Sequence, residues 1–250
     1  MIEEYEQLGL FDEEYPQYKI DKPIRLITTF SGIGSQEMAL KRLGVNFEIY
    51  KAVEFDKHAM AAYNAIHGTN FPTLDIRDVH GKDLEIVDKD KYCYILFYSW
   101  PCTDLSLAGR QAGMEEGSGT RSSLLWEVKR LIEELKDNLP DVLISENVPQ
   151  CHSDSNIAAF ERWILFLRNL GYSNYYGDLN AKDFGVPQNR DRCFMVSMLG
   201  KYDFQFPKPI PLEKVINDVL EEEVEEKFFI RNEKAELLIN QLIKDGKIEE

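Results

Sequence analysis

The chain has 250 residues, of which 44% are apolar and 12% aromatic. This length and composition suit one large or two small domains with a substantial core, and they exclude a wholly disordered chain. No run of about 18 apolar residues is present, and the chain opens with acidic rather than basic residues, so we expect a soluble, cytoplasmic protein without a membrane span. Four cysteines without a C-x-x-C pair indicate a reducing compartment and no disulfide scaffold.

The net charge of −15 would ordinarily disfavour a nucleic-acid partner, because phosphate groups bind basic surfaces. The acidity is concentrated at the two ends: residues 1–20 carry a net charge of −5 and residues 213–250 a net charge of −6. The remaining middle of the chain is therefore close to neutral, which is compatible with a locally positive cleft. Charge alone does not decide for or against nucleic acid.

Short β-branched or apolar runs predict strands, and amphipathic runs closed by glycine predict helices. Another strand is expected just before Asp75, which would make the run at residues 92–98 the fourth strand. The alternation predicts an α/β domain with a mostly parallel, twisted sheet, helices on both faces and ligands beyond the carboxyl ends of the strands. The remaining predicted strands are residues 25–30, 47–54, 141–145, 172–179 and 192–199, and the predicted helices are 35–43, 57–67, 122–135 and 156–170.

The chain divides into three parts by composition. Residues 1–22 are predicted to be a mostly solvated acidic arm, and residues 23–206 to be the α/β domain. Three prolines open the last part, residues 207–250, which we interpret as a connector followed by an acidic helical tail. The apolar residues of a tail helix at 233–243 need cover, which either a partner or the protein's own domain can provide.

A glycine turn follows the first predicted strand, at Phe30-Ser31-Gly32-Ile33-Gly34. Such a turn lets the backbone approach a ligand, although a tight turn without a ligand has the same sequence. Glu54 ends the second strand at the spacing from which a carboxylate can accept hydrogen bonds from ribose hydroxyls. Phe55 can stack on a base and Asp75 can receive an exocyclic amine. Glu37 replaces the last glycine of the dinucleotide fingerprint, so a nucleoside cofactor without a pyrophosphate fits better.

Cys102 lies in a loop at the carboxyl end of a strand, directly after Pro101, where a nucleophile would be placed. The alternative is a buried small apolar residue, and this is the interpretation we adopt for Cys93, Cys151 and Cys193. The four histidines do not have the spacing of metal ligands, so no metal site is predicted.

Two polar segments follow or precede later strands. Glu146, at a strand exit beside Asn147, can act as a general acid or can simply cap a turn. Arg190 and Arg192 alternate on an extended segment and point the same way, so they can clamp a carboxylate or a phosphate. Each feature alone is ordinary.

Together and in this order, these segments resemble the DNA cytosine-5 methyltransferases that use S-adenosylmethionine. The resemblance covers about residues 24–230 and implies a Rossmann-like S-adenosylmethionine-dependent methyltransferase fold, with residues 23–206 as the catalytic domain. Supporting matches lie at residues 109–111, 180–181 and 185–187. The four motifs that carry it are the Phe30–Gly34 turn, Pro101-Cys102, Glu146-Asn147-Val148 and Gln188-x-Arg190-x-Arg192.

By this resemblance, Cys102 attacks C6 of cytosine as the thiolate, while Glu146 holds and protonates N3. Asn147 positions the loop, and Arg192, with Arg190 nearby, contacts the base carbonyl and orients Glu146. The methyl group is then transferred to C5, and loss of the C5 proton with elimination of Cys102 releases the product. Because C5 is unreachable inside a duplex, the cytosine must be flipped into the pocket.

The resemblance also assigns a cofactor and a nucleic-acid partner. Thr103 stands where the family usually has Gln, which puts one loop contact with DNA in question but not the nucleophile. Residues expected to line the S-adenosylmethionine site are Phe30, Gly32, Ile33, Gly34, Glu54, Phe55, Asp75, Ile76 and Pro101. Contacts with double-stranded DNA are expected from Ser106, Arg110, Gln111, Arg121 and Gln188.

Family members normally continue, after the segment that resembles residues 211–230, into a target-recognition domain and two further motifs. We therefore expect the catalytic subunit of a split, restriction-modification-type methyltransferase, whose second polypeptide supplies those parts. One alternative is a non-catalytic or regulatory methyltransferase-like binding protein, against which the intact Cys102, Glu146 and Arg192 argue. The other is an RNA cytosine-5 methyltransferase, which these residues do not separate from a DNA enzyme.

Overall fold

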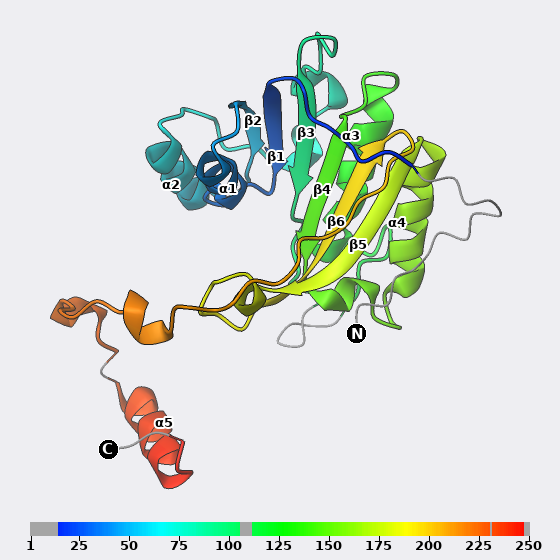
Figure 1. Ribbon diagram of the computed structural model, residues 1–250. Coiled ribbons are helices and arrows are strands. Elements are labelled where there is room, and N and C mark those ends of the chain that lie inside the picture. Colours follow the sequence, from blue (N-terminus) through cyan, green and yellow to red (C-terminus); the bar gives the residue numbers. More distant parts are fainter. Residues whose placement is uncertain (1–14, 106–111, 231, 248–250) are drawn as a thin grey trace.

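The computed structural model describes residues 15–105, 112–230 and 232–247. Its core is a six-stranded sheet in the order β2-β1-β3-β4-β6-β5 (Figure 1). The strands are β1 (Ile24–Thr29), β2 (Phe47–Val53), β3 (Cys93–Tyr98), β4 (Val142–Asn147), β5 (Tyr172–Asn180) and β6 (Asp191–Leu199). The helices of more than four residues are α1 (Ser35–Leu43), α2 (Lys57–His67), α3 (Leu125–Leu135), α4 (Ile157–Asn169) and α5 (Glu233–Lys244).

The sheet has a parallel half and an antiparallel half. Strands β2, β1, β3 and β4 pair in parallel, whereas β6 runs antiparallel to both β4 and β5. Strand β3, Cys93–Tyr98, is apolar on both faces because it lies in the middle of the sheet with helices on either side. The predicted mostly parallel α/β sheet is confirmed.

One predicted strand is wrong. The segment before Asp75 forms no strand; Asp75 instead caps the short 3₁₀ helix Ile76–Asp78 by accepting from the Arg77 amide. The backbone there is engaged elsewhere, since the Asn64 side chain of α2 binds both the amide and the carbonyl of Phe71. Strand β3 is therefore the third strand, and Cys102 follows the third strand rather than a fourth.

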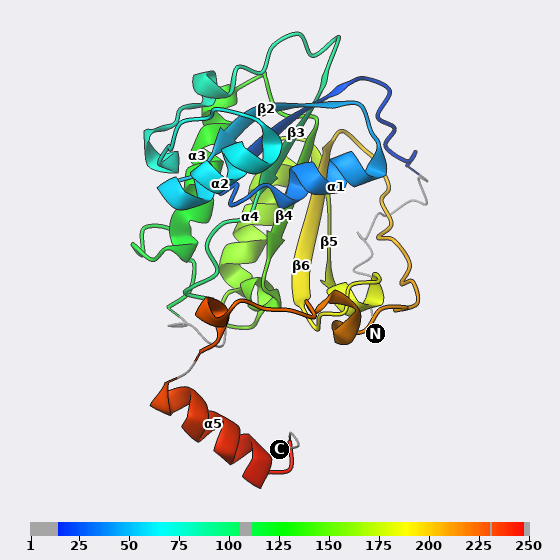
Figure 2. The ribbon, with the colours of Figure 1, turned by 90° about the vertical axis from the view of Figure 1, so that its left-hand side faces the viewer.

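Two hydrophobic clusters lie on opposite faces of the sheet. Figures 1 and 2 place α1 and α2 on the side of the sheet opposite to α3 and α4. The larger cluster packs α3 and α4 against one face, with Trp163 and Phe160 among its fully buried side chains. The other face packs Leu26 and Ile95 against Leu40 of α1. Burial on both faces provides most of the stability of the fold.

Part of the acidic arm is packed rather than solvated. Tyr18 joins the cluster under α1, its ring meets the Tyr202 ring edge-on at 4.8 Å, and Gln17 forms a bridge with Asp203. The remainder of the arm that is described, including Lys19 and Ile20, is mostly exposed. Residues 15–22 thus lie alongside the segment that leaves β6. Leu8, Leu10 and Phe11, the other docking candidates, lie outside the described residues.

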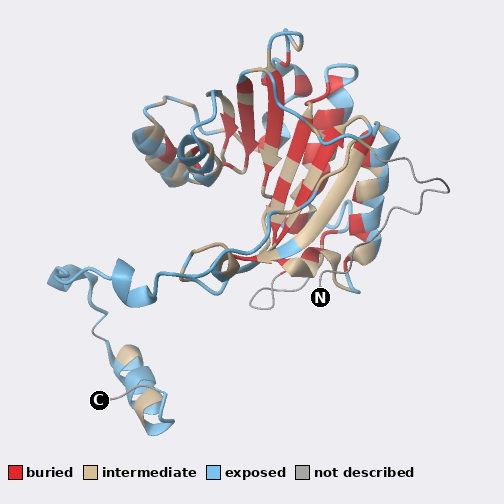
Figure 3. Cartoon of the chain, viewed as in Figure 1, coloured by how far each residue is buried: buried red, intermediate tan, exposed pale blue. Residues whose placement is uncertain are grey.

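The segment after Ile210 leaves the α/β domain; Ile210 itself still forms a bridge with Phe184, and its amide donates to the Asp183 carbonyl at 2.8 Å. Figure 3 shows α5 and the chain leading to it as almost entirely exposed, and Figure 2 shows α5 standing away from the sheet. Leu237 and Leu238 of α5 are 62% and 60% exposed, so the protein's own domain does not cover them. No helix in the described part of the chain has both the length and the apolar character to cross a membrane.

The carboxylate of Glu134 on α3 fastens the loop before β3. It accepts from the Gly81 amide at 2.7 Å and pairs with Arg130 and His80. The Gly81 N–H group, with Arg130 and His80 adding to its effect, lowers the pKa of Glu134 to about 2 from a usual 4.5. The charged form is therefore the one that stabilises the fold.

Replacing Glu134 by glutamine is expected to lower the free energy of unfolding at neutral pH by about 1 kcal/mol, a modest loss because solvent screens a partly exposed pair. When the pKa of a carboxyl group is lower in the folded than in the unfolded chain, its stabilising effect is fully present above the unfolded-state pKa. The effect is lost as the pH falls through the folded-state pKa. The deficit should therefore shrink between pH 4.5 and about 2. Urea unfolding at several pH values measures it, and Glu161→Gln, an exposed site on α4, is the control.

Candidate active site

The predicted functional segments meet at one edge of the sheet. The carboxyl ends of β1, β2, β3 and β4 lie at the same edge because these strands are parallel. The antiparallel β6 begins at that edge, opposite the end of β4. This is the lower edge of the sheet in Figure 1.

The glycine turn, residues 30–34, follows β1 in a conformation that favours glycine. Gly32 and Gly34 have φ values of 55° and 83°, and Phe30 also has a positive φ, 56°. The Glu54 carboxylate holds the turn from β2: it accepts from the Gly32 amide at 2.8 Å and from the Asp56 amide at 2.8 Å. Each oxygen of Glu54 thus receives one backbone hydrogen bond and has a second lone pair available for a ligand.

The two glycines differ in the space around them. A Cβ built at Gly34 would lie 2.1 Å from Nε2 of His67, whose ring nitrogen also bonds the Ile33 carbonyl at 3.0 Å. A Cβ at Gly32 meets nothing within 4 Å. Gly34 therefore serves the close packing of α2 against the turn, whereas Gly32 leaves open space next to the Glu54 carboxylate.

We expect Gly34→Ala to lower the free energy of unfolding by about 2 kcal/mol, since it adds a clash to the cost of a positive φ. Gly32→Ala is expected to cost about 1 kcal/mol or less, because only the backbone strain applies. Urea unfolding of the two variants measures the difference. Equal losses would show that His67 simply moves aside.

Other residues expected at the cofactor site lie around this turn. Phe55, just after Glu54, is 70% exposed, and Ile33 in the turn is 49% exposed. The Arg77 guanidinium binds the carboxylate of Asp75 and keeps its pKa below the usual range, so Asp75 is ionised. Ile76, by contrast, is only 4% exposed and belongs to the core cluster.

The Pro-Cys loop, residues 99–105, is held by neighbouring elements. Nδ2 of Asn147 donates to the Trp100 carbonyl at 2.9 Å, and the Ser122 hydroxyl donates to the Pro101 carbonyl at 2.7 Å. Asn147 also accepts from the Val148 amide, which fixes its amide group. The loop leaves Cys102 partly exposed at the edge of the core. Cys93, Cys151 and Cys193 are buried, as predicted.

Glu146 and Arg192 form an ion pair beside this loop. Nε of Arg192 lies 2.8 Å from Oε1 of Glu146, and the side chains are 20% and 23% exposed. Arg190 lies farther away, at 3.7 Å, and is more exposed. Burial of about four fifths of both side chains makes the pair stronger than an ordinary surface salt bridge. The arrangement presents a carboxyl group of fixed orientation to an open site.

An open pocket of about 590 Å³ adjoins this pair. Neither Cys102 nor Glu146 belongs to its lining, so the pocket is a groove beside Arg192 that does not enclose these two predicted catalytic residues. Residues that line it include Gln188, Asn189, Arg190 and Arg192. Asp178 and Asp191 also line it, so the groove is polar without a net formal charge, and its two arginines are the groups that could contact phosphates.

The expected DNA contacts are only partly described. Ser106, Arg110 and Gln111 lie outside the described residues. Arg121 is exposed and its amide donates to Asp104 at 2.8 Å, while Gln188 is exposed in the pocket. The structure brings Gln188 close to Arg190 and Arg192, whereas Arg121 lies at the start of the segment that leads into α3.

Sequence reasoning missed the residues that fasten the Pro-Cys loop. Asp104 is only 7% exposed, and its Oδ2 accepts from the Arg121 and Ser122 amides. The signal was an acid close behind the predicted nucleophile, which can cap a following segment. Glu37 was seen only as a missing glycine. It is fully buried under the turn and accepts from the hydroxyls of Tyr63 and Thr28.

Comparison with known proteins gives the same family as the motifs. Residues 24–247 match the C-5 cytosine-specific DNA methylase family. The chain is 34% identical to the type II methyltransferase M2.ScrFI of Lactococcus lactis subsp. cremoris, over 84% of this chain and 71% of that protein. It is 32% identical to the orphan methyltransferase M.SssI of Spiroplasma monobiae, over 84% of this chain and 68% of that protein. The chain thus spans about seven tenths of the length of these relatives.

The fold has counterparts among solved structures. The S. pombe Dnmt2 methyltransferase superposes with a TM-score of 0.66 at 22% identity, covering 87% of this chain and 65% of that one. This likeness supports the Rossmann-like methyltransferase architecture of the sheet and its helices. With the match over residues 24–247, it follows that the chain belongs to the C-5 cytosine-specific DNA methylase family.

Proposed function

We propose that this chain transfers a methyl group to C5 of a cytosine in DNA, with Cys102 as the nucleophile. Its family makes it a methyltransferase, and the homologues are type II cytosine methyltransferases. The observation that carries the proposal is the Glu146–Arg192 pair at 2.8 Å, next to a Pro-Cys loop that Asn147 fastens. A thiol in the loop after β3 and an oriented carboxyl group at the end of β4, the parallel neighbour of β3, can act on one flat ring between them.

The proposed chemistry begins with addition to the ring. The Cys102 thiolate forms a bond to C6 while Glu146 delivers a proton to N3, so that the electron pair of the C5–C6 double bond becomes available at C5. The methyl group then passes to C5 as its bond to the donor's sulfur breaks. The C5 proton is lost to solvent, N3 returns its proton to Glu146, and the C6–sulfur bond breaks, which restores the double bond, the acid and the thiolate. Arg192 keeps Glu146 directed at the ring throughout.

Family membership implies S-adenosylmethionine as the methyl donor, which when bound supplies an electrophilic methyl group. The residues present fit such a group. The open space at Gly32 admits a ligand next to the backbone, and the free lone pairs of Glu54 can accept from two ribose hydroxyls. The ionised Asp75 can accept from an exocyclic amine. These residues bind and orient the donor relative to Cys102.

Duplex DNA hides the reacting atoms, so the target base must leave the stack. The arginines of the pocket next to Glu146 can hold the phosphates on either side of a flipped base. The chain as a whole carries a net charge of −15, which lowers its own affinity for DNA. A second polypeptide with target-recognition function is therefore part of the proposal, and the uncovered apolar residues of α5 support it.

The decisive experiment measures transfer of a labelled methyl group from S-adenosylmethionine to mixed-sequence DNA. The chain is assayed alone and together with the product of the neighbouring reading frame. Transfer that needs both proteins, and that places the label at C5 of cytosine, supports the proposal. Robust, sequence-specific transfer by the chain alone would refute the split arrangement but not the chemistry.

Two further outcomes separate the alternatives. Label incorporated into RNA but not into DNA would assign an RNA substrate instead. If neither nucleic acid is labelled with any combination of proteins, while S-adenosylmethionine still binds, the chain is a non-catalytic binding protein. Isothermal titration with S-adenosylmethionine provides that binding measurement.

A further inference from the structure

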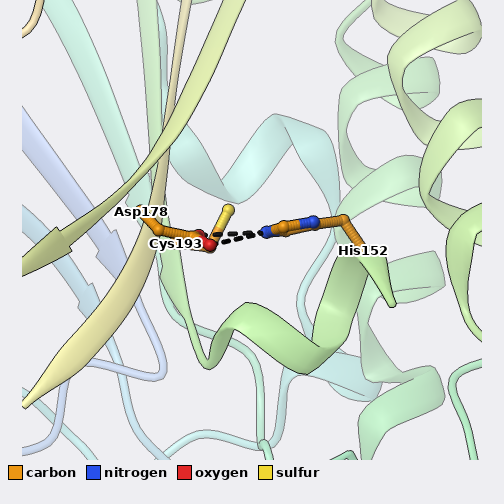
Figure 4. A group of neighbouring side chains, drawn as sticks. All are labelled: His152, Asp178 and Cys193. Carbon is orange, nitrogen blue, oxygen red and sulfur yellow. Dashed lines mark hydrogen bonds and ion pairs between the residues drawn. The ribbon is translucent and has the colours of Figure 1, made fainter. Parts of the chain in front are cut away.

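A cluster of potential metal ligands lies next to the proposed catalytic pair, Glu146 and Arg192. His152, Asp178 and Cys193, the His152 cluster, present Nε2, a carboxylate oxygen and Sγ within 4.8 Å of one another (Figure 4). Nε2 of His152 lies 3.0 Å from Oδ1 of Asp178. Among the described residues this is the one such convergence of three ligand-forming side chains. The sequence prediction of no metal site rested on spacing along the chain, which cannot show ligands from three separate elements.

The backbone fixes the positions of these ligands. Asp178 on β5 and Cys193 on β6 are direct cross-strand partners, so their side chains leave the same face of the sheet side by side. His152 ends the 3₁₀ turn Pro149–His152, which follows β4, and its ring packs on those of Phe160 and Tyr176. The imidazole is therefore directed at the β5–β6 pair by packing that does not depend on Asp178.

We propose that His152, Asp178 and Cys193 bind a divalent transition-metal ion, with Zn²⁺ the best match to their chemistry. Thiolate, imidazole and carboxylate are the ligand types that zinc takes in proteins, usually in tetrahedral geometry. Ligand atoms of such a site lie about 3.3–3.8 Å apart, so side-chain shifts of roughly 1 Å close the observed set around an ion. Water from the adjacent pocket supplies the fourth ligand.

An ion can reach the cluster from solvent. The side chains of Asp178 and His152 are 41% and 26% exposed, and Asp178 also lines the open pocket next to Arg192. Cys193 is 3% exposed and forms the floor of the site. The site therefore has a buried thiol ligand on one side and an accessible imidazole and carboxylate on the other.

The ion would connect elements that carry the proposed active site. The turn that contains His152 follows Glu146, Asn147 and Val148 directly, and Cys193 is the neighbour of Arg192 on β6. A bond from each of these elements to one ion would hold the carboxyl group and its guanidinium partner in register. This role is structural, so it does not depend on the proposed reaction.

The test uses the full-length chain, stripped with a chelator and titrated with Co²⁺ in slightly alkaline buffer. Tetrahedral Co²⁺ bound to a thiolate gives a near-ultraviolet charge-transfer band, which we expect to saturate at one equivalent. Cys193→Ser should abolish the band, and Cys93→Ser, a buried cysteine on β3, should retain it. No band in the unmodified chain, or a band that survives in Cys193→Ser, would overturn the proposal.

A second readout guards against a Cys193 variant that fails to fold. Saturating Zn²⁺ should raise the thermal unfolding midpoint of the stripped chain by about 5 °C or more, since an ion that binds only the folded state stabilises it. Asp178→Asn changes an exposed carboxylate, leaves the packing intact and should remove this shift. If Zn²⁺ raises the unfolding midpoint of Asp178→Asn as much as that of the unmodified chain, the ion binds elsewhere and the assignment is wrong.

Discussion

Cys102→Ser is expected to reduce methyl transfer to DNA by at least about a thousandfold, since the reaction would lose the proposed nucleophile and a serine hydroxyl is a far weaker one near neutral pH. The measurement is single-turnover transfer of labelled methyl groups, in the presence of whatever partner the activity requires. The variant should still bind S-adenosylmethionine, because Gly32 and Glu54 lie on other loops. Loss of transfer with retained binding assigns the effect to the chemical step.

The control for this variant is Cys93→Ser. Cys93 is also a free cysteine, but it is buried at the first residue of β3, at the opposite end of this strand from the Pro-Cys loop. It should retain transfer within about tenfold, because only its local packing and its contact with the Tyr18 hydroxyl change. If Cys102→Ser keeps activity comparable to that of Cys93→Ser, the covalent mechanism is wrong, whatever the substrate.

Trp163→Ala on α4 is expected to lower the free energy of unfolding by about 4 kcal/mol, the largest stability loss we anticipate from one substitution. The indole is fully buried, its ring meets the Tyr98 ring edge-on at 5.6 Å, and Nε1 donates to the Tyr98 hydroxyl at 3.0 Å. Truncation leaves both a cavity and a buried hydroxyl that has lost a partner. Urea unfolding followed by circular dichroism measures the change.

The matched control lies two residues along the same helix. Leu165 is 52% exposed, so Leu165→Ala should change stability by no more than about 0.5 kcal/mol. Both substitutions introduce alanine into α4, so helix propensity cannot explain the difference between them. A similar loss in both variants would mean that the helix contributes through its own formation rather than through its contact with Tyr98.

The fold was largely predictable because its signals are local. The predicted bounds of six strands and of the helices between them agree with the observed bounds to within a few residues. Apolar runs mark each element, and glycines mark where helices end. The strand expected before Asp75 failed for a non-local reason. Asn64, on the preceding helix, takes the backbone hydrogen bonds of Phe71 that a strand would have used. No pattern within that segment reveals such a competitor.

The sequence alone proposes the residues of the candidate site, but it does not show which hydrogen bonds hold them in place. Motif order located Cys102, Glu146 and Arg192. The hydrogen bonds that hold the Pro-Cys loop come from Asn147 and Ser122, which lie 47 and 21 residues away from their acceptors. Likewise the cluster of Asp178 and Cys193 depends on the register of β5 against β6. Contacts of this kind follow from pairing between strands, which a single sequence does not specify.

The change of direction at β6 has a geometric consequence for the carboxyl–guanidinium pair. Strand β6 has nine residues, which corresponds to roughly 30 Å from its first residue to its last. Had it run parallel to β4, Arg192 would begin the strand at the remote edge of the sheet, a full strand length from Glu146. A shift of one residue between the two strands would turn the guanidinium toward the other side of the sheet. The direction and register of β6 against β4 thus set the alignment of this acid.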